Sequence, residues 1–111
     1  MVLVADIGNT NITLGIYKND ELIFVSRLAT QRHRTSEQYA IELNAVFNLE
    51  GISGSFEGAV ISSVVPELTR AFKEAVEKVT KAKALVVAAG IKNGLKINPK
   101  FFSIFMRFYI S

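Results

Sequence analysis

The chain has 111 residues, of which half are apolar and about a fifth are charged, and its formal net charge is +3. These values predict one globular domain with a buried core and exclude a disordered chain, and the absence of cysteine excludes disulfides and thiolate metal sites. The positive charges are scattered, and neither a signal peptide nor a membrane-spanning stretch is evident, so we expect a cytoplasmic protein with no nucleic-acid and no membrane partner.

The first thirty residues predict three strands in an antiparallel meander. Short runs rich in valine, isoleucine and leucine predict strands at residues 1–7, 12–17 and 21–30. Residues 18–20, KND, separate the second strand from the third and are typical of a tight turn.

Helices and strands alternate in the next sixty residues. Thr35 and Gln38 have capping-box spacing before an amphipathic run, which predicts a helix over residues 36–49. GAVISSVV predicts a fourth strand, Pro66 fits the first turn of a second helix, and KALVVAA predicts a fifth strand. The order β-β-β-α-β-α-β predicts an α/β fold with a mixed five-stranded sheet, as in the ribonuclease H-like, actin-like fold.

The turn between the first two predicted strands is the strongest candidate site. Asp6 lies near the end of a buried strand, where ligands gather in open α/β sheets, and its carboxylate suits Mg²⁺ directly or through water. Gly8 lets the backbone approach a phosphate closely, and Asn9, Thr10 and Asn11 add hydrogen-bond donors. The alternative is a plain hairpin turn, because glycine and asparagine are common in such turns.

Two other polar groups are weaker candidates. Arg32, His33 and Arg34 precede the first helix and suit anion contacts, although a solvated loop is the favoured interpretation. Ser62 and Ser63 end the fourth strand, where they either line a ligand cleft or satisfy the turn before the second helix.

Four segments occur in the order typical of one known family: DIGNTNITLGIY, TQRHRTSEQYA, ISSVVPELT and GIKNGLKI. Together they resemble the type III pantothenate kinases, which include the Bvg accessory factor homologues and belong to the actin-like ATPase, acetate kinase and sugar kinase superfamily. The resemblance covers residues 1–97, which we expect to form an N-terminal, ATP-phosphate-binding domain.

This resemblance implies an activity and the residues that serve it. It implies ATP-dependent phosphorylation of pantothenate to phosphopantothenate, in coenzyme A biosynthesis, by a homodimer that uses Mg²⁺ and a monovalent cation, K⁺ or NH₄⁺. Asp6 would help to hold Mg²⁺. The residues implied in binding the ATP phosphates are Asp6, Gly8, Asn9, Thr10, Asn11 and Thr13.

A second segment, GIKNGLK, resembles the part of the family that enters the pantothenate pocket. The family usually has threonine where this chain has Asn93, which puts the detailed contact in question. The pocket residues implied are Gly90, Lys92, Asn93 and Gly94.

Just beyond the segments that carry the resemblance, the NPK of residues 98–100 still looks like the family. The family continues with a Gly-Ala-Asp-Arg segment that contains the catalytic aspartate, and its second domain holds the monovalent-cation site; these 111 residues contain neither. We therefore expect an atypical Phe-rich tail over residues 98–111, no assignable catalytic residue, and little or no kinase activity from this truncated form. The alternative is a non-catalytic nucleotide-binding or regulatory module.

Three interpretations of the Phe-rich tail, FFSIFMRFYIS, remain open. It is an out-of-frame or truncated ending, a cover for a sheet face left by the missing domain, or a short amphipathic segment for a membrane surface. The abrupt change in composition favours the first.

Overall fold

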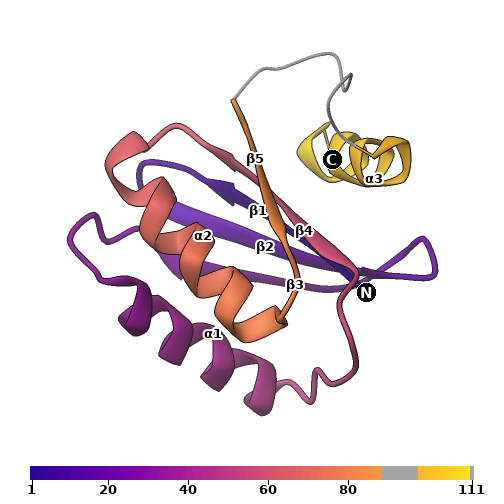
Figure 1. Ribbon diagram of the computed structural model, residues 1–111, viewed down its shortest axis with the longest axis horizontal. Helices are drawn as coiled ribbons and strands as arrows, with labels where there is room; N and C mark the ends of the chain where they lie inside the picture. The colour runs from indigo at the N-terminus through magenta and orange to yellow at the C-terminus, as the bar shows by residue number, and fades with distance from the viewer. Residues whose placement is uncertain (89–97, 111) are drawn as a thin grey trace.

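The computed structural model describes residues 1–88 and 98–110, which are drawn in colour in Figure 1. In chain order the elements are β1 (Val2–Ile7), β2 (Asn11–Lys18), β3 (Glu21–Ala29), α1 (Ser36–Leu49), β4 (Gly58–Ser63), α2 (Pro66–Thr80), β5 (Ala84–Ala88) and α3 (Pro99–Ile110). The strands form one mixed sheet in the order β3-β2-β1-β4-β5. The first three strands pair antiparallel, whereas β1, β4 and β5 run parallel, so the predicted sheet is confirmed.

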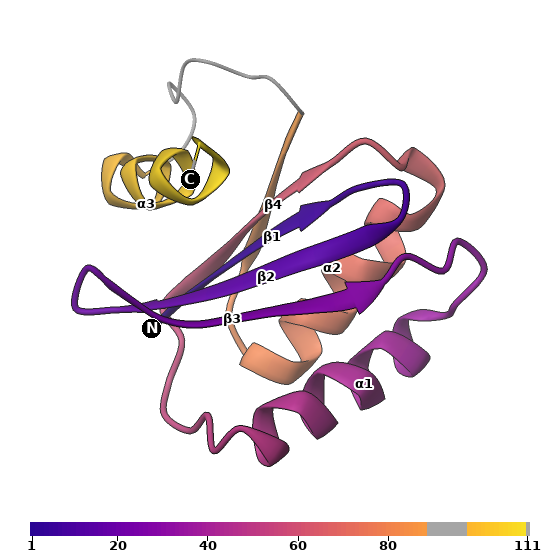
Figure 2. The same ribbon diagram turned by 180° about the vertical axis from the view of Figure 1, so that it is seen from behind.

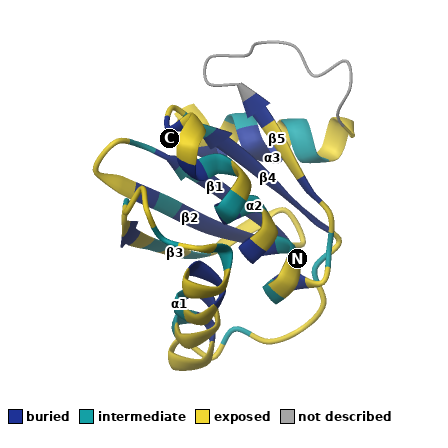
Figure 3. Ribbon diagram, turned by 60° about the vertical axis from the view of Figure 1, so that its left-hand side comes forward, coloured by how far each residue is buried: buried dark blue, intermediate teal, exposed yellow. Residues whose placement is uncertain are grey.

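Helices cover both faces of the sheet. Figure 1 and Figure 2 show α1 and α2 side by side on one face and α3 on the opposite face. Successive side chains of β1 point to opposite faces of the sheet. Leu3, Ala5 and Ile7 join the core under α1 and α2, while Val2 and Val4 pack with α3. The central strands are therefore dark blue along most of their length in Figure 3.

The local signals in the sequence fix the ends of the predicted elements. Asn19 and Asp20 both have positive φ, of 51° and 70°, which is the backbone of a tight two-residue hairpin turn. The Thr35 hydroxyl accepts the Gln38 N–H at 3.2 Å, while the Gln38 side chain accepts the Thr35 N–H at 2.9 Å. Pro66 opens α2, where its missing N–H is no loss.

Helix α3 is an addition to the predicted order. Its aromatic rings lie over two glycines of the sheet, Phe108 over Gly15 and Phe101 over Gly58. A Cβ atom added at these glycines would lie 2.3 Å and 2.6 Å from the respective rings, closer than real Cβ contacts come. Only glycine therefore admits α3 this close to the sheet.

In the structure the tail forms α3, which covers one face of the sheet. Ile104 and Phe105 are buried with Phe108 in the second core cluster. The start of the helix has a recognisable cap, because the Asn98 side chain accepts the Lys100 N–H at 2.8 Å. Within the described residues, no helix is long and apolar enough to cross a membrane.

Candidate phosphate-binding site

A row of three polar side chains crosses the sheet near the carboxyl ends of β1 and β4. Asp6 pairs with Thr13 of the antiparallel strand β2 and with Ser62 of the parallel strand β4. Residues paired across a sheet share a face, so these three lie on the face that carries α3, one row beyond Val4. Val87 continues the row on β5 and packs with α3, so the helix borders the polar row.

The Asp6 carboxylate is half-buried. Burial raises the pKa of Asp6 above its ordinary value of 3.8. No ion pair involves Asp6 in the described part of the chain. A desolvated carboxylate without a basic neighbour is suited to a cation supplied from outside.

The neighbouring hydroxyl of Ser62 is fully buried. Its Oγ has no hydrogen-bond partner among residues 1–88 and 98–110. An unsatisfied hydroxyl of this kind is costly, which calls for an explanation in the site. Ser63 differs, because its Oγ accepts the Val65 N–H at 3.0 Å and the Thr69 hydroxyl at 2.9 Å. Ser63 thus satisfies the strand-to-helix turn, and only Ser62 remains available to the site.

The hairpin loop after Asp6 is braced from the end of β3. The Gly8 N–H donates to the Asn11 carbonyl at 2.9 Å, so Gly8 contributes shape to the loop and no free donor. The Thr30 hydroxyl donates to the Gly8 carbonyl at 2.7 Å, and the Thr30 N–H donates to the Thr10 carbonyl at 2.9 Å. Thr30 was not among the residues predicted for the site, because a threonine at the end of a strand gives no signal in the sequence.

The exposed part of this loop offers side chains to a ligand. Asn9, Thr10 and Asn11 are all exposed, and the bracing by Thr30 holds the loop in one shape. Preorganised donors of this kind suit phosphate oxygens. The loop and Asp6 are therefore adjacent, as the sequence predicts.

The described residues fit Mg²⁺ as a largely hydrated ion. They contain no group of three or more histidine, aspartate or glutamate side chains able to enclose a metal. Mg²⁺ keeps several waters and is commonly bound through one or two carboxylates together with phosphate oxygens. Asp6 is such a carboxylate, so the donor set suits a metal that arrives with a nucleotide.

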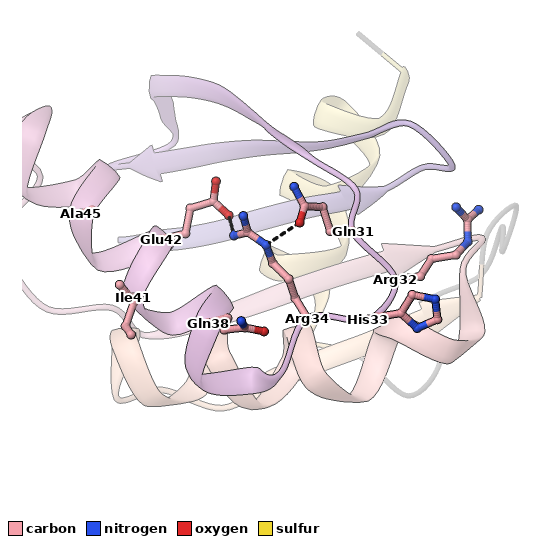
Figure 4. A pocket seen from close by; sticks show the side chains of 8 residues that line it. All are labelled: Gln31, Arg32, His33, Arg34, Gln38, Ile41, Glu42 and Ala45. Atoms are coloured by element: carbon pink, nitrogen blue, oxygen red, sulfur yellow. Dashed lines mark hydrogen bonds and ion pairs between the residues drawn. The ribbon is translucent and has the colours of Figure 1, made fainter.

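A surface hollow lies elsewhere, beside the start of α1 (Figure 4). It has a volume of about 610 Å³ and contains neither Asp6 nor Ser62. The lining residues are Gln31, Arg32, His33, Arg34, Gln38, Ile41, Glu42 and Ala45. Within it, Arg34 binds Glu42 at 2.6 Å and the Gln31 side chain at 2.9 Å, and stacks over Tyr39. Arg34 thus ties the loop to α1, as a structural contact.

Arg32 reaches the hairpin instead. Its Nη2 donates to the Asn9 side-chain oxygen at 2.7 Å. The cationic cluster before α1 therefore divides into one residue at the candidate site and one that fixes the loop. The sequence alone did not separate the two. The predicted pocket residues Gly90, Lys92, Asn93 and Gly94 lie outside the described residues.

The model of the family described as type III pantothenate kinase matches residues 2–101. The chain belongs to this family. A type III pantothenate kinase from Bacillus cytotoxicus is 40% identical over 104 residues, which cover 90% of this chain and 40% of that relative. The chain thus spans about two fifths of the length of this curated relative.

Two solved structures resemble the fold. The ROK hexokinase from Thermus thermophilus has a TM-score of 0.54 at 16% identity, over 78% of this chain and 33% of that chain. A Bacteroides thetaiotaomicron protein with an actin-like ATPase fold has a TM-score of 0.54 at 9% identity, over 78% and 32%. At these identities they show the fold alone, and the predicted actin-like fold is confirmed.

Proposed function

We propose that this chain supplies the ATP-phosphate-binding half of a pantothenate kinase active site. The observation that carries the proposal is the half-buried carboxylate of Asp6 beside a braced loop of exposed polar residues. Membership of the pantothenate kinase family supports ATP and pantothenate as the substrates. Residues 1–97 are proposed as the N-terminal domain, and residues 98–111 as the atypical tail that covers its sheet.

In this proposal each residue of the hairpin has a physical task. Phosphoryl transfer demands positioning and charge neutralisation more than covalent chemistry from the protein. The residues proposed to form the ATP-phosphate site are Asp6, Gly8, Asn9, Thr10, Asn11 and Thr13. Asp6 holds Mg²⁺ directly or through water, and Gly8 keeps the loop tight, since a Cβ there would lie 3.2 Å from the Asn11 carbonyl. Mg²⁺, when bound, supplies the positive charge that offsets the phosphates.

The 111 residues are proposed to bind nucleotide and to transfer phosphate weakly or not at all. General-base catalysis needs a carboxylate near the substrate hydroxyl, and the family segment that supplies it has no counterpart here. The monovalent-cation site for K⁺ or NH₄⁺ and the homodimer contacts are likewise assigned to the longer family members. A cytoplasmic location follows from the proposed role in coenzyme A synthesis.

Nucleotide binding by the purified chain tests the proposal. We expect calorimetric titration to give binding of ATP that strengthens with Mg²⁺, and we expect Asp6→Asn to remove most of that Mg²⁺ effect. Glu21→Gln, which removes one negative charge from the exposed start of β3, is the matched control and should leave binding unchanged. Absence of ATP binding by the wild-type chain would contradict the proposal.

A turnover assay separates the enzyme from the alternative, a non-catalytic nucleotide-binding or regulatory module. The observation that favours the alternative is α3, which forms a second core cluster with the sheet from within these residues. Mg²⁺-dependent ATP binding without phosphopantothenate formation supports the module. Phosphopantothenate that accumulates with time, and is lost with Asp6→Asn, would show that the 111 residues are sufficient for catalysis.

A further inference from the structure

Arg32 links the tip of the hairpin to the start of α2. Its Nη2 donates to the Asn9 side-chain oxygen at 2.7 Å, and its Nε lies 3.5 Å from a carboxylate oxygen of Glu67. The Arg32 side chain is 39% exposed and that of Glu67 is 57% exposed. One contact is thus a short hydrogen bond and the other a loose, solvated ion pair that contributes little to stability.

The guanidinium retains donors beyond these two contacts. A guanidinium has five N–H groups, and the contacts found among the described residues use Nη2 and Nε. Arg34 provides the contrast, since it has a close carboxylate, a side-chain amide and an aromatic ring. Figure 4 shows Arg32 directed away from the Arg34–Glu42 pair. Of the two arginines, Arg32 has the greater capacity for a new ligand.

The contact with Arg32 also determines how Asn9 faces a ligand. The Asn9 oxygen, its only side-chain acceptor, is directed to the guanidinium. The NH₂ group is therefore on the opposite side of the amide and is the part left to meet a ligand. This orientation converts an amide of mixed character into a donor, which suits an anion.

We propose that Arg32 is a phosphate-binding residue of the hairpin site: on nucleotide binding its guanidinium exchanges Glu67 for a phosphate oxygen pair and keeps Asn9 oriented as a donor. This inference rests on the proposed function, because it requires the hairpin to hold the nucleotide. Arginine binds phosphate through two parallel N–H···O contacts, and a phosphate carries more charge than a solvated carboxylate. Glu67 is thus a competitor that holds Arg32 while the site is empty.

Three single variants, one double variant and a control variant test this exchange by titration with Mg²⁺–ATP. Arg32→Ala should weaken binding at least tenfold, and Arg32→Lys should recover part of the loss. Glu67→Gln should strengthen binding about threefold, since it releases the guanidinium. That gain should vanish in the Arg32→Ala/Glu67→Gln double variant. Arg70→Ala removes the same charge from a side chain of α2 that is 91% exposed and should change binding less than twofold.

The outcomes are distinguishable from those of the proposed function. If Asp6→Asn weakens Mg²⁺–ATP binding while Arg32→Ala behaves like Arg70→Ala, the hairpin site stands and this inference fails. If Glu67→Gln still strengthens Mg²⁺–ATP binding in the Arg32→Ala background, Glu67 acts only by repelling the phosphates. That result would also overturn the exchange. If the wild-type chain binds no nucleotide, both proposals fail. Unfolding midpoints for every variant identify any loss that comes from instability, and Glu67→Gln tests the exchange without removing Arg32.

Discussion

Phe108 of α3 lies over Gly15 of the sheet. The substitution Gly15→Ala should therefore raise the free energy of unfolding if α3 is absent from this face and lower it if α3 is packed there. Gly15 lies within β2 and does not have a positive φ. Alanine in a strand is favoured over glycine by about 0.5–1 kcal/mol, so the substitution Gly15→Ala would stabilise a sheet without α3. With α3 docked, the new Cβ would lie 2.3 Å from Cε1 and 2.8 Å from Cδ1 of Phe108.

The crowding should outweigh the gain in the strand. Overpacking of a core costs about 1–3 kcal/mol, so we expect Gly15→Ala to lower the free energy of unfolding by up to about 2.5 kcal/mol. Urea unfolding followed by circular dichroism measures this value. Repeating Gly15→Ala in the Phe108→Ala background shows whether the Phe108 ring causes the loss of stability. Without that ring the same substitution should be stabilising.

The pair Gly58 and Phe101 provides the matched control. Gly58→Ala would place a Cβ 2.6 Å from the Phe101 ring. Its cost should be relieved by Phe101→Ala and not by Phe108→Ala. An increase in stability for Gly15→Ala in the otherwise unchanged chain would refute the packing of α3 described above.

Three further substitutions test the site and the first helix by urea unfolding. Burial raises the pKa of Asp6, so the folded chain binds that proton more tightly than the unfolded chain and loses stability as pH rises from 3.8 through the raised pKa. Asp6→Asn should therefore be more stable than wild type at pH 7 and equal to it near pH 3; lower stability at pH 7 would reverse the argument. Ser62→Ala should be neutral or stabilising because it removes a buried hydroxyl without a partner, whereas a clear loss would mean that the hydroxyl is satisfied. Thr35→Ala should cost about 0.5–2 kcal/mol through loss of the helix cap, and an unchanged midpoint would contradict that role.

Signals that act over a few neighbouring residues predicted most of the sheet. They also predicted α1 and α2, the two helices on one of its faces. Thr35 with Gln38, Pro66, and the turn at Asn19 and Asp20 each act over a few residues, so the sequence shows them directly. The pairing of Asp6 with Ser62 follows from the parallel arrangement of β1 and β4. The order of elements predicted a mixed sheet and did not say which strands pair.

Local sequence signals could not predict contacts between segments that are far apart in the chain. The spacing of Phe101, Phe105 and Phe108 suits a helix, yet its meaning depends on Gly15 and Gly58, which become neighbours only in the folded sheet. The same holds for the site. A cluster of basic residues predicts a charged loop, but which arginine meets the hairpin depends on how that loop crosses the end of the sheet.

The distance between the two glycines under α3 is similar to the distance between the two phenylalanines that cover them. Gly15 and Gly58 lie two strands and two residues apart, a diagonal of about 12 Å at ordinary strand spacing and rise. Phe101 and Phe108 are seven residues apart, a rise of about 10.5 Å along a helix. The interval between the two phenylalanines therefore matches the interval between the two glycines, while Ile104 and Phe105 fill the core between them. A shift of α3 along its axis by one turn, about 5.4 Å, would therefore move both rings off their glycines at once, so the two contacts together set the register of the helix on the sheet.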